Sequence, residues 1–206
     1  MEDRQPLGLW LELLRGDDVE ARAAVLADAG LRVSTWIADD YPERLPKTID
    51  DCASLLVGEG DPATYDALPA AAETTTVVPL RRFPRPSQGI CTGERTTGLL
   101  LVLISPRAEA DAQALRDWAD FVHLRWIAAA CVPGYTMITP YAHVDAGTPR
   151  FCHFYEMTSD DPRKTFESMT PLVCDLLGGP QNPAFVEWTR HPALRINYCN
   201  SFRRLS

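Results

Sequence analysis

The chain has 206 residues, of which 46% are hydrophobic and 23% are charged, and its formal net charge at pH 7 is −8. This composition is typical of a globular protein and excludes a disordered chain. The acidic balance argues against a nucleic-acid or anionic-membrane partner, because both need a basic surface. The most apolar run, Leu99 to Ile104, is much shorter than the ~20 residues of a membrane-spanning helix. Because the N-terminus also lacks a signal-peptide pattern, we expect a cytoplasmic protein.

The first half of the chain predicts elements in the order β-α-β-β-α-β. Apolar and β-branched runs predict strands, and Asp before a helix and Gly after it mark where helices begin and end. The expected strands are 7–14, 31–38, 52–60 and 73–83, and the expected helices are 17–30 and 61–71. A connector rich in Pro and Gly follows at 84–94.

The same order repeats in the second half. The expected strands are 96–105, 134–145, 149–157 and 194–205, and the expected helices are 106–130 and 161–179. A split β-α-β order of this kind is typical of the ferredoxin-like fold. We therefore predict an α+β protein in which tandem ferredoxin-like β-α-β-β-α-β repeats form an α/β barrel with antiparallel sheets. The first half spans 1–90, the second spans 95–206, and a pocket lies between them; two independent halves on a string are the alternative.

Six cysteines are scattered singly, and none has the spacing of a metal site. A chain of this length buries enough apolar surface to fold without disulfides, so we expect free thiols and no bound metal. The six are Cys52, Cys91, Cys131, Cys152, Cys174 and Cys199.

One histidine stands out on the helix predicted over 106–130. At about 100° per residue this helix carries one apolar stripe, and His123 falls at the margin of that stripe. Either this histidine bonds a backbone carbonyl as part of the packing, or it is a general acid or base, because a pKa of ~6.5 leaves both of its forms populated at neutral pH. The stripe consists of Leu115, Trp118, Val122 and Trp126.

Two predicted strands add further candidates. Alternation along 149–157 places His153 and Tyr155 on one covered face, where a buried imidazole needs a partner. Along 134–145 the same alternation groups Tyr135, Tyr141 and His143, although His143 lies near the hairpin end. A tyrosine hydroxyl in a dry pocket can donate to an oxygen that gains charge, and Tyr141 suits that role better than Tyr135, which lies at the start of its strand.

A set of short motifs in residues 97–205 resembles the EthD-like branch of the dimeric α/β-barrel superfamily. The motifs are Asp117-Trp118, His123, Val132-Pro133-Gly134, Pro149-Arg150-Phe151, Tyr155-Glu156 and Arg203-Arg204. The resemblance implies a pocket for a small molecule. Members include polyketide cyclases, lactone isomerases, dehydratases, decarboxylases and cofactor-free monooxygenases, and haem enzymes share the architecture, so the fold alone does not choose among them.

We therefore expect a cofactor-free enzyme, without a metal, that performs His/Tyr proton transfer on an aromatic or polyketide-like small molecule as a cyclase, dehydratase, isomerase or decarboxylase. The alternatives are a cofactor-independent monooxygenase, a non-catalytic ligand-binding module and, with an unobstructed histidine ligand, a haem protein. A homodimer is a further expectation. The expected catalytic residues are His123, His153 and Tyr141, and the expected substrate-binding residues are Trp118, Trp126, Tyr135 and Tyr155.

Overall fold

A computed structural model describes residues 5–16, 18–39, 47–89 and 94–205. These residues form a nine-stranded antiparallel sheet in the order β4-β1-β3-β2-β9-β6-β8-β7-β5. A further pairing between β4 and β7 closes the sheet into a barrel. The two halves are therefore joined twice, once through β2 and β9 and once through β4 and β7.

The first half contains four of the barrel strands and one α-helix. Its strands are β1 (Gly8–Leu14), β2 (Arg32–Ala38), β3 (Ser54–Gly60) and β4 (Thr76–Arg82). The helix is α1 (Val19–Asp28), and a 3-10 helix, η1 (Pro62–Ala67), replaces the short helix expected over 61–71. Asp18 and Asp61 accept hydrogen bonds from backbone N–H groups at the start of α1 and of η1, so both turns begin where the Asp pattern predicted.

The second half contains the other long strands and most of the helices. Its strands are β6 (Gly98–Pro106), β7 (Tyr135–His143), β8 (Phe151–Met157) and β9 (Leu194–Arg204). The short strand β5 (Gln88–Gly89) belongs to the connector. Its helices are α4 (Pro162–Leu176), α5 (Pro183–Thr189) and the long helix expected over 106–130. The structure divides that long helix into η2 (Glu109–Asp111), α2 (Ala112–Trp118), a π-helical turn η3 (Ala119–His123) and α3 (Leu124–Ala129).

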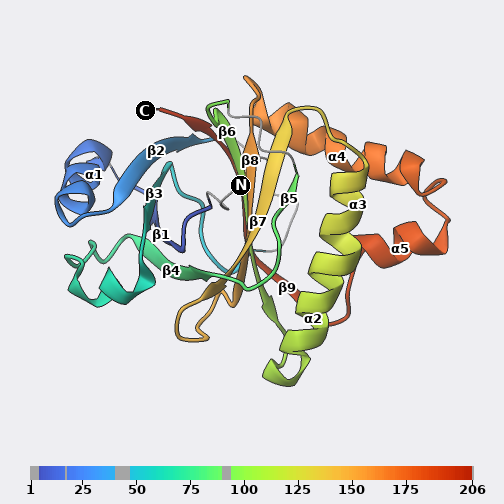
Figure 1. The fold of residues 1–206 in the computed structure, drawn as a ribbon, viewed down its shortest axis with the longest axis horizontal. Helices are drawn as coiled ribbons and strands as arrows, with labels where there is room; N and C mark the ends of the chain where they lie inside the picture. Colours follow the sequence, from blue (N-terminus) through green and yellow to red (C-terminus); the bar gives the residue numbers. More distant parts are fainter. Residues whose placement is uncertain (1–4, 17, 40–46, 90–93, 206) are drawn as a thin grey trace.

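The helices lie outside the barrel on two opposite sides. Figure 1 shows α1 beside the strands of the first half, and α2, α3, α4 and α5 together on the side of the second half. None of the helices among the described residues is both long enough and apolar enough to span a membrane. The five cysteines that can be placed are free thiols, and Cys91 lies outside the described residues.

The inside of the barrel is a packed core to which both halves contribute. Leu11 and Trp36 from the first half meet Phe154, Tyr198 and Phe202 from the second in one buried apolar cluster. The predicted pocket between the halves is therefore filled by side chains over most of its extent. A hollow of about 270 Å³ remains between the halves, and its walls carry polar and charged groups. A separate, apolar cavity lies outside the barrel, beneath the helices of the second half.

Candidate functional site

An apolar cavity of about 370 Å³ lies in the second half, between the outer face of β6, β8 and β9 and the helices that cover it. Aliphatic side chains of the strands, aromatic side chains of the helices and Tyr155 of β8 make most of the lining, and none of the side chains that line it is charged. The aliphatic residues are Leu100, Val102, Ile104, Leu194 and Ile196, the aromatic ones Trp118, Tyr155, Phe166 and Trp188, and the polar ones His123, His153, Thr170, Thr189 and Cys199, with Met169 beside them.

The π-helical turn brings Trp118 and His123 together. In this turn the N–H of Leu124 bonds the carbonyl of Ala119, one residue further back than in an α-helix. Side chains five residues apart point roughly 140° apart on a regular helix, yet the rings of Trp118 and His123 lie with centroids 5.1 Å apart. The regular spacing used to place His123 at the margin of the stripe was therefore wrong, because it assumed an uninterrupted helix.

The same turn separates Trp126 from the cavity. The indole of Trp126 packs at the edge of the apolar cluster beneath α4, with the guanidinium of Arg125 5.6 Å from its centroid. Trp126 is absent from the cavity lining, whereas Trp118 is part of it. The expectation that both tryptophans hold one ligand is not met by this arrangement.

His123 is held by two reciprocal hydrogen bonds to Trp188 of α5. Its Nδ1 lies 3.0 Å from the Trp188 carbonyl oxygen, and the indole Nε1 of Trp188 donates to the His123 carbonyl, also at 3.0 Å. Burial lowers the pKa of His123, and the bond to the Trp188 carbonyl opposes that effect only in part. The neutral imidazole must carry its proton on Nδ1 to donate to this carbonyl, which leaves the lone pair on Nε2 for a ligand.

His123 is also the centre of a stack of rings. Its imidazole lies between Trp118 and Trp188, at centroid distances of 5.1 Å and 4.9 Å, and is nearly parallel to Trp188 at 10°. The stack continues to His191 beyond Trp118 and to Phe185 beyond Trp188. The Nε1 of Trp118 donates to the backbone carbonyl of Glu187 at 2.8 Å, so the stack is anchored at both indoles.

Trp188 is a site residue that the sequence reasoning missed. No element was predicted between residues 180 and 193, although α5 lies there. The available signal was Asn182-Pro183, a favourable start for a helix, because the Asn182 side chain accepts from the N–H of Ala184 at 2.9 Å. The contact of Trp188 with His123 spans 65 residues and has no sequence signature.

His153 comes from β8 and is almost completely buried, with 2% of its surface exposed. It pairs with Pro140 of β7, and its Nε2 has no hydrogen-bond partner among the described residues. Burial holds its pKa well below the ordinary value, and Arg116 and His123 lower it further. His153 is therefore neutral at pH 7 and places a second uncharged imidazole in the cavity wall.

The tyrosines divide between the two faces of the sheet. Tyr155 lines the cavity, and Tyr135 lies behind it at a centroid distance of 5.6 Å. Tyr141 pairs with Cys152 and lies in the packed interior of the barrel, on the face opposite His153. A bulge between Tyr135 and Met137 inserts one extra residue into β7, so the simple alternation that grouped Tyr135 with Tyr141 was wrong. Tyr141 therefore does not share a site with His123 and His153.

His143 lies at the end of β7, outside the cavity lining. Its Nδ1 accepts a hydrogen bond from the N–H of Asp145 at 3.2 Å, and burial lowers its pKa. Within the described ranges, no three or more His, Cys, Asp or Glu side chains gather in a group that could hold a metal ion.

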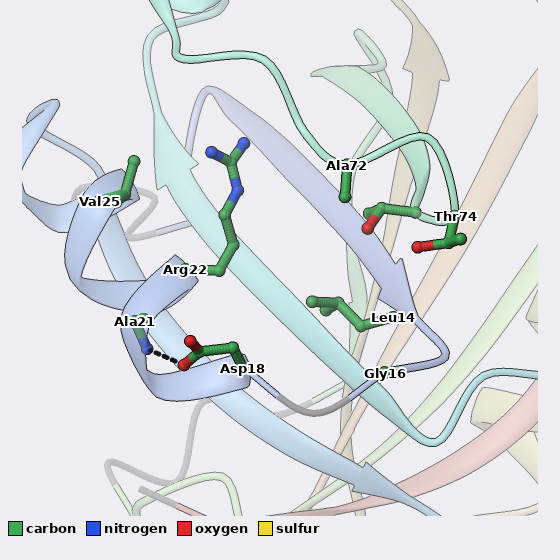
Figure 2. A pocket seen from close by; sticks show the side chains of 9 residues that line it. Leu14, Gly16, Asp18, Ala21, Arg22, Val25, Ala72 and Thr74 are labelled. Atoms are coloured by element: carbon green, nitrogen blue, oxygen red, sulfur yellow. Dashed lines mark hydrogen bonds between the residues drawn. The ribbon is translucent and has the colours of Figure 1, made fainter.

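A third hollow, of about 360 Å³, lies on the first half, between α1 and the segment that leads into β4 (Figure 2). Its two charged side chains already have partners. Asp18 bonds the N–H of Ala21, and Arg22 pairs with Glu12 and donates to the carbonyl of Pro69. The chemistry available to a ligand is therefore poorer here than in the cavity with two imidazoles.

Comparison with known proteins shows the fold. No protein-family model and no curated protein matches the chain. A putative monooxygenase from Fusobacterium nucleatum is similar in structure, with a TM-score of 0.57 and 8% sequence identity over 98% of this chain and 93% of that one. A major regulator of staphylococcal pathogenesis gives 0.55 and 9% over 97% and 99%. A chlorite dismutase variant from Candidatus Nitrospira defluvii gives 0.55 and 9% over 98% and 93%. These similarities span both halves and confirm the predicted α+β fold of two ferredoxin-like repeats.

Proposed function

We propose that the protein is an enzyme that transforms an uncharged small molecule in the cavity of the second half, with His123 as the general base. The observation that carries the proposal is the bond from His123 Nδ1 to the Trp188 carbonyl, which directs the lone pair to Nε2. A base that is already neutral at pH 7 needs no prior deprotonation, and an apolar wall of aromatic rings strengthens every polar contact with the substrate.

The remaining polar groups suit stabilisation of negative charge. Once His123 has taken a proton, an oxygen of the substrate gains charge, and the neutral imidazole of His153 or the hydroxyl of Tyr155 donates a hydrogen bond to it. This division of roles replaces the expected His123/Tyr141 pair with side chains that line one cavity.

The lining restricts both the substrate class and the reaction class. Because no charged side chain lines the cavity, a carboxylate or phosphate on the substrate would be desolvated without a countercharge. A neutral aromatic or polyketide-like molecule fits this environment, and proton removal from it leads to isomerisation, cyclisation or dehydration. Decarboxylation would require such a carboxylate on the substrate, so binding of a decarboxylase substrate is disfavoured for the same reason.

Placement in the EthD-like branch is part of this proposal. Trp118, His123 and Tyr155 belong to the motifs that resemble that branch, and all three line the cavity. Motif residues from a helix and from a separate strand that surround one cavity support a shared site better than the motifs alone.

A cofactor-independent monooxygenase is the second candidate. One of the similar structures is named a putative monooxygenase, and the stacked indoles beside His123 suit an electron-rich ring. In that reaction His123 deprotonates a CH2 group of the substrate, and the carbanion adds dioxygen and regains the proton from His123 to form a hydroperoxide. Breakage of the O–O bond then leaves one oxygen on the carbon as a carbonyl and releases the other as water, with both hydrogens supplied by the substrate. Turnover that persists without oxygen excludes this candidate and favours the isomerase, cyclase or dehydratase.

The test compares His123→Gln with His143→Gln, because His143 is a histidine outside the cavity lining. Extracts and a panel of neutral polycyclic phenols and enones are incubated with each protein, and consumption is followed by mass spectrometry. General-base loss should reduce turnover by about 10²–10⁴-fold in His123→Gln, and His143→Gln should behave as wild type. Equal turnover in wild type, His123→Gln and His143→Gln would show that His123 takes no part in the chemistry. Ligand binding without turnover by the wild-type protein would favour a binding module.

A further inference from the structure

The connector between the two halves reaches across to the helix that carries His123. Its backbone is fixed to the barrel through β5, in which Gln88 pairs with Ile138 of β7. From this anchored segment two side chains reach the π-helical turn. Arg85 contacts the Asp120 carboxylate at 3.1 Å, and the Gln88 Nε2 donates to the Asp120 backbone carbonyl at 2.9 Å.

The Asp120 carbonyl is the group that the π-helical turn releases from its usual partner. In a regular α-helix this carbonyl would accept the N–H of Leu124, four residues later. Here the Leu124 N–H bonds Ala119 instead. The Gln88 amide therefore replaces the Leu124 N–H as the donor to the Asp120 carbonyl. This hydrogen bond reduces the free-energy cost of the irregular turn.

The Asp120 side chain adds a second restraint. Its two carboxylate oxygens accept from the buried Arg116 at 2.6 Å and 2.8 Å, and one of them also accepts from Arg85. The Arg116 guanidinium lies 4.4 Å from the centroid of Phe83, the residue that immediately precedes the connector. Both the backbone and the side chain of Asp120 are thus held by the segment that joins the halves.

The register of this turn decides where His123 points. Converting the π-helical turn to a regular α-helix removes one residue from the turn and rotates everything after it by about 100° relative to α2. The imidazole would then leave its place between Trp118 and Trp188. We propose that Gln88 is a positioning residue for His123, holding the π-helical turn in the register that presents this imidazole to the cavity.

This inference rests on the proposed function only for its effect on turnover, since the placement of the imidazole is measured without a substrate. Nitrogen-detected NMR of the histidine rings, with His123 identified through His123→Gln, reports which ring nitrogen carries the proton and the pKa. The other histidine rings near His123 are His153 in the cavity wall and His191 on the far face of Trp118, and they are followed in the same spectra. The Tyr155 phenol also lines the cavity, and burial keeps its pKa far above that of a histidine.

The decisive variant is Gln88→Leu, which keeps the size of the side chain and removes the amide. The matched control is Gln113→Leu on α2, because the Gln113 amide donates to the exposed side of the same helix, at Asp117. Gln88→Leu should lose the Nδ1-protonated form of His123 and move its pKa toward the ordinary value. Gln113→Leu should leave both unchanged. Once a substrate is known, turnover of Gln88→Leu should be about tenfold lower, the size expected for one lost hydrogen bond.

An unchanged His123 signal in folded Gln88→Leu would overturn the inference. If that variant does not fold, Gln88→Asn decides, because it keeps the amide but shortens its reach by one methylene and should shift His123 in the same direction. A displaced imidazole with unaltered turnover would uphold the positioning role and contradict the proposed function of His123, so the two failures are distinguishable.

Discussion

The hydroxyl of Tyr141 provides a sharp test of the barrel interior. Tyr141 is completely buried, and its hydroxyl oxygen has no hydrogen-bond partner among the described residues. Burial raises its pKa far above the ordinary value, so the group is a neutral phenol whose donor is unused. Tyr141→Phe removes a desolvated polar atom and leaves the ring in its edge-on contact with Phe154.

The size of the effect follows from the cost of an unsatisfied buried hydroxyl. Such a group lowers the free energy of unfolding by about 1–3 kcal/mol. The small void that is left when the oxygen is removed offsets part of the gain. We expect the free energy of unfolding of Tyr141→Phe to rise by about 1 kcal/mol. For a chain of this length, that change corresponds to a rise in Tm of about 3 °C.

Tyr198→Phe is the matched control in the same core cluster. Tyr198 is also completely buried, but its hydroxyl lies 3.3 Å from the Cys52 sulfur and shares a hydrogen bond with it. Removing this hydroxyl breaks a bond, so the free energy of unfolding should fall by about 1 kcal/mol. Urea denaturation followed by tryptophan fluorescence and by circular dichroism measures both variants under one set of conditions.

Opposite signs for the two variants are the expected result. If Tyr141→Phe destabilises the protein as much as Tyr198→Phe, the Tyr141 hydroxyl has a native partner and the description of the interior is wrong. Because Tyr141 lies on the sheet face opposite the cavity, turnover should also be unchanged in Tyr141→Phe. A tenfold loss of turnover would return Tyr141 to the site.

Three further outcomes are expected. The pKa of His153 is lowered in the folded state, so the unfolded chain binds more protons than the folded protein below about pH 6.5. The free energy of unfolding therefore falls on acidification by up to about 1.4 kcal/mol per pH unit. Urea titrations at pH 7.5 and 5.5 should show a smaller fall in His153→Leu than in wild type, and an equal fall would contradict the assignment. Arg116→Met should lower the free energy of unfolding by about 3–5 kcal/mol, because it removes the main partner of the buried Asp120 carboxylate. Arg163→Met breaks a pair at the surface and should lower it by less than about 1 kcal/mol. Thermal denaturation distinguishes the two. Proteolytic cleavage within 84–95 should leave the halves associated in gel filtration, because two strand pairings join them, and separation into two folded halves would refute the shared barrel.

The sequence by itself determined the order of the eight long strands and the positions of α1 and α4, but not the short strand β5 or the helix α5. Period-two runs and Asp caps are local signals, and they located the strands, α1 and α4 to within a few residues. The repetition of the β-α-β-β-α-β order was enough to predict the fold class. The burial of His153 was likewise visible in the pattern, since an imidazole on a covered strand face is conspicuous. His123 was singled out only as a histidine at the margin of an apolar stripe.

The tertiary structure alone decided which of these side chains share a site. The helix register at His123 depends on a π-helical turn held by Gln88 and Asp120, and the face of Tyr135 depends on a bulge in β7. Neither irregularity has a local sequence signal, because each is stabilised by contacts from a distant segment. Closure of the barrel then filled the space between the halves and left the cavity under the helices of the second half. Those long-range contacts, rather than any residue's own preference, placed His123 beside His153 and moved Tyr141 to the opposite face.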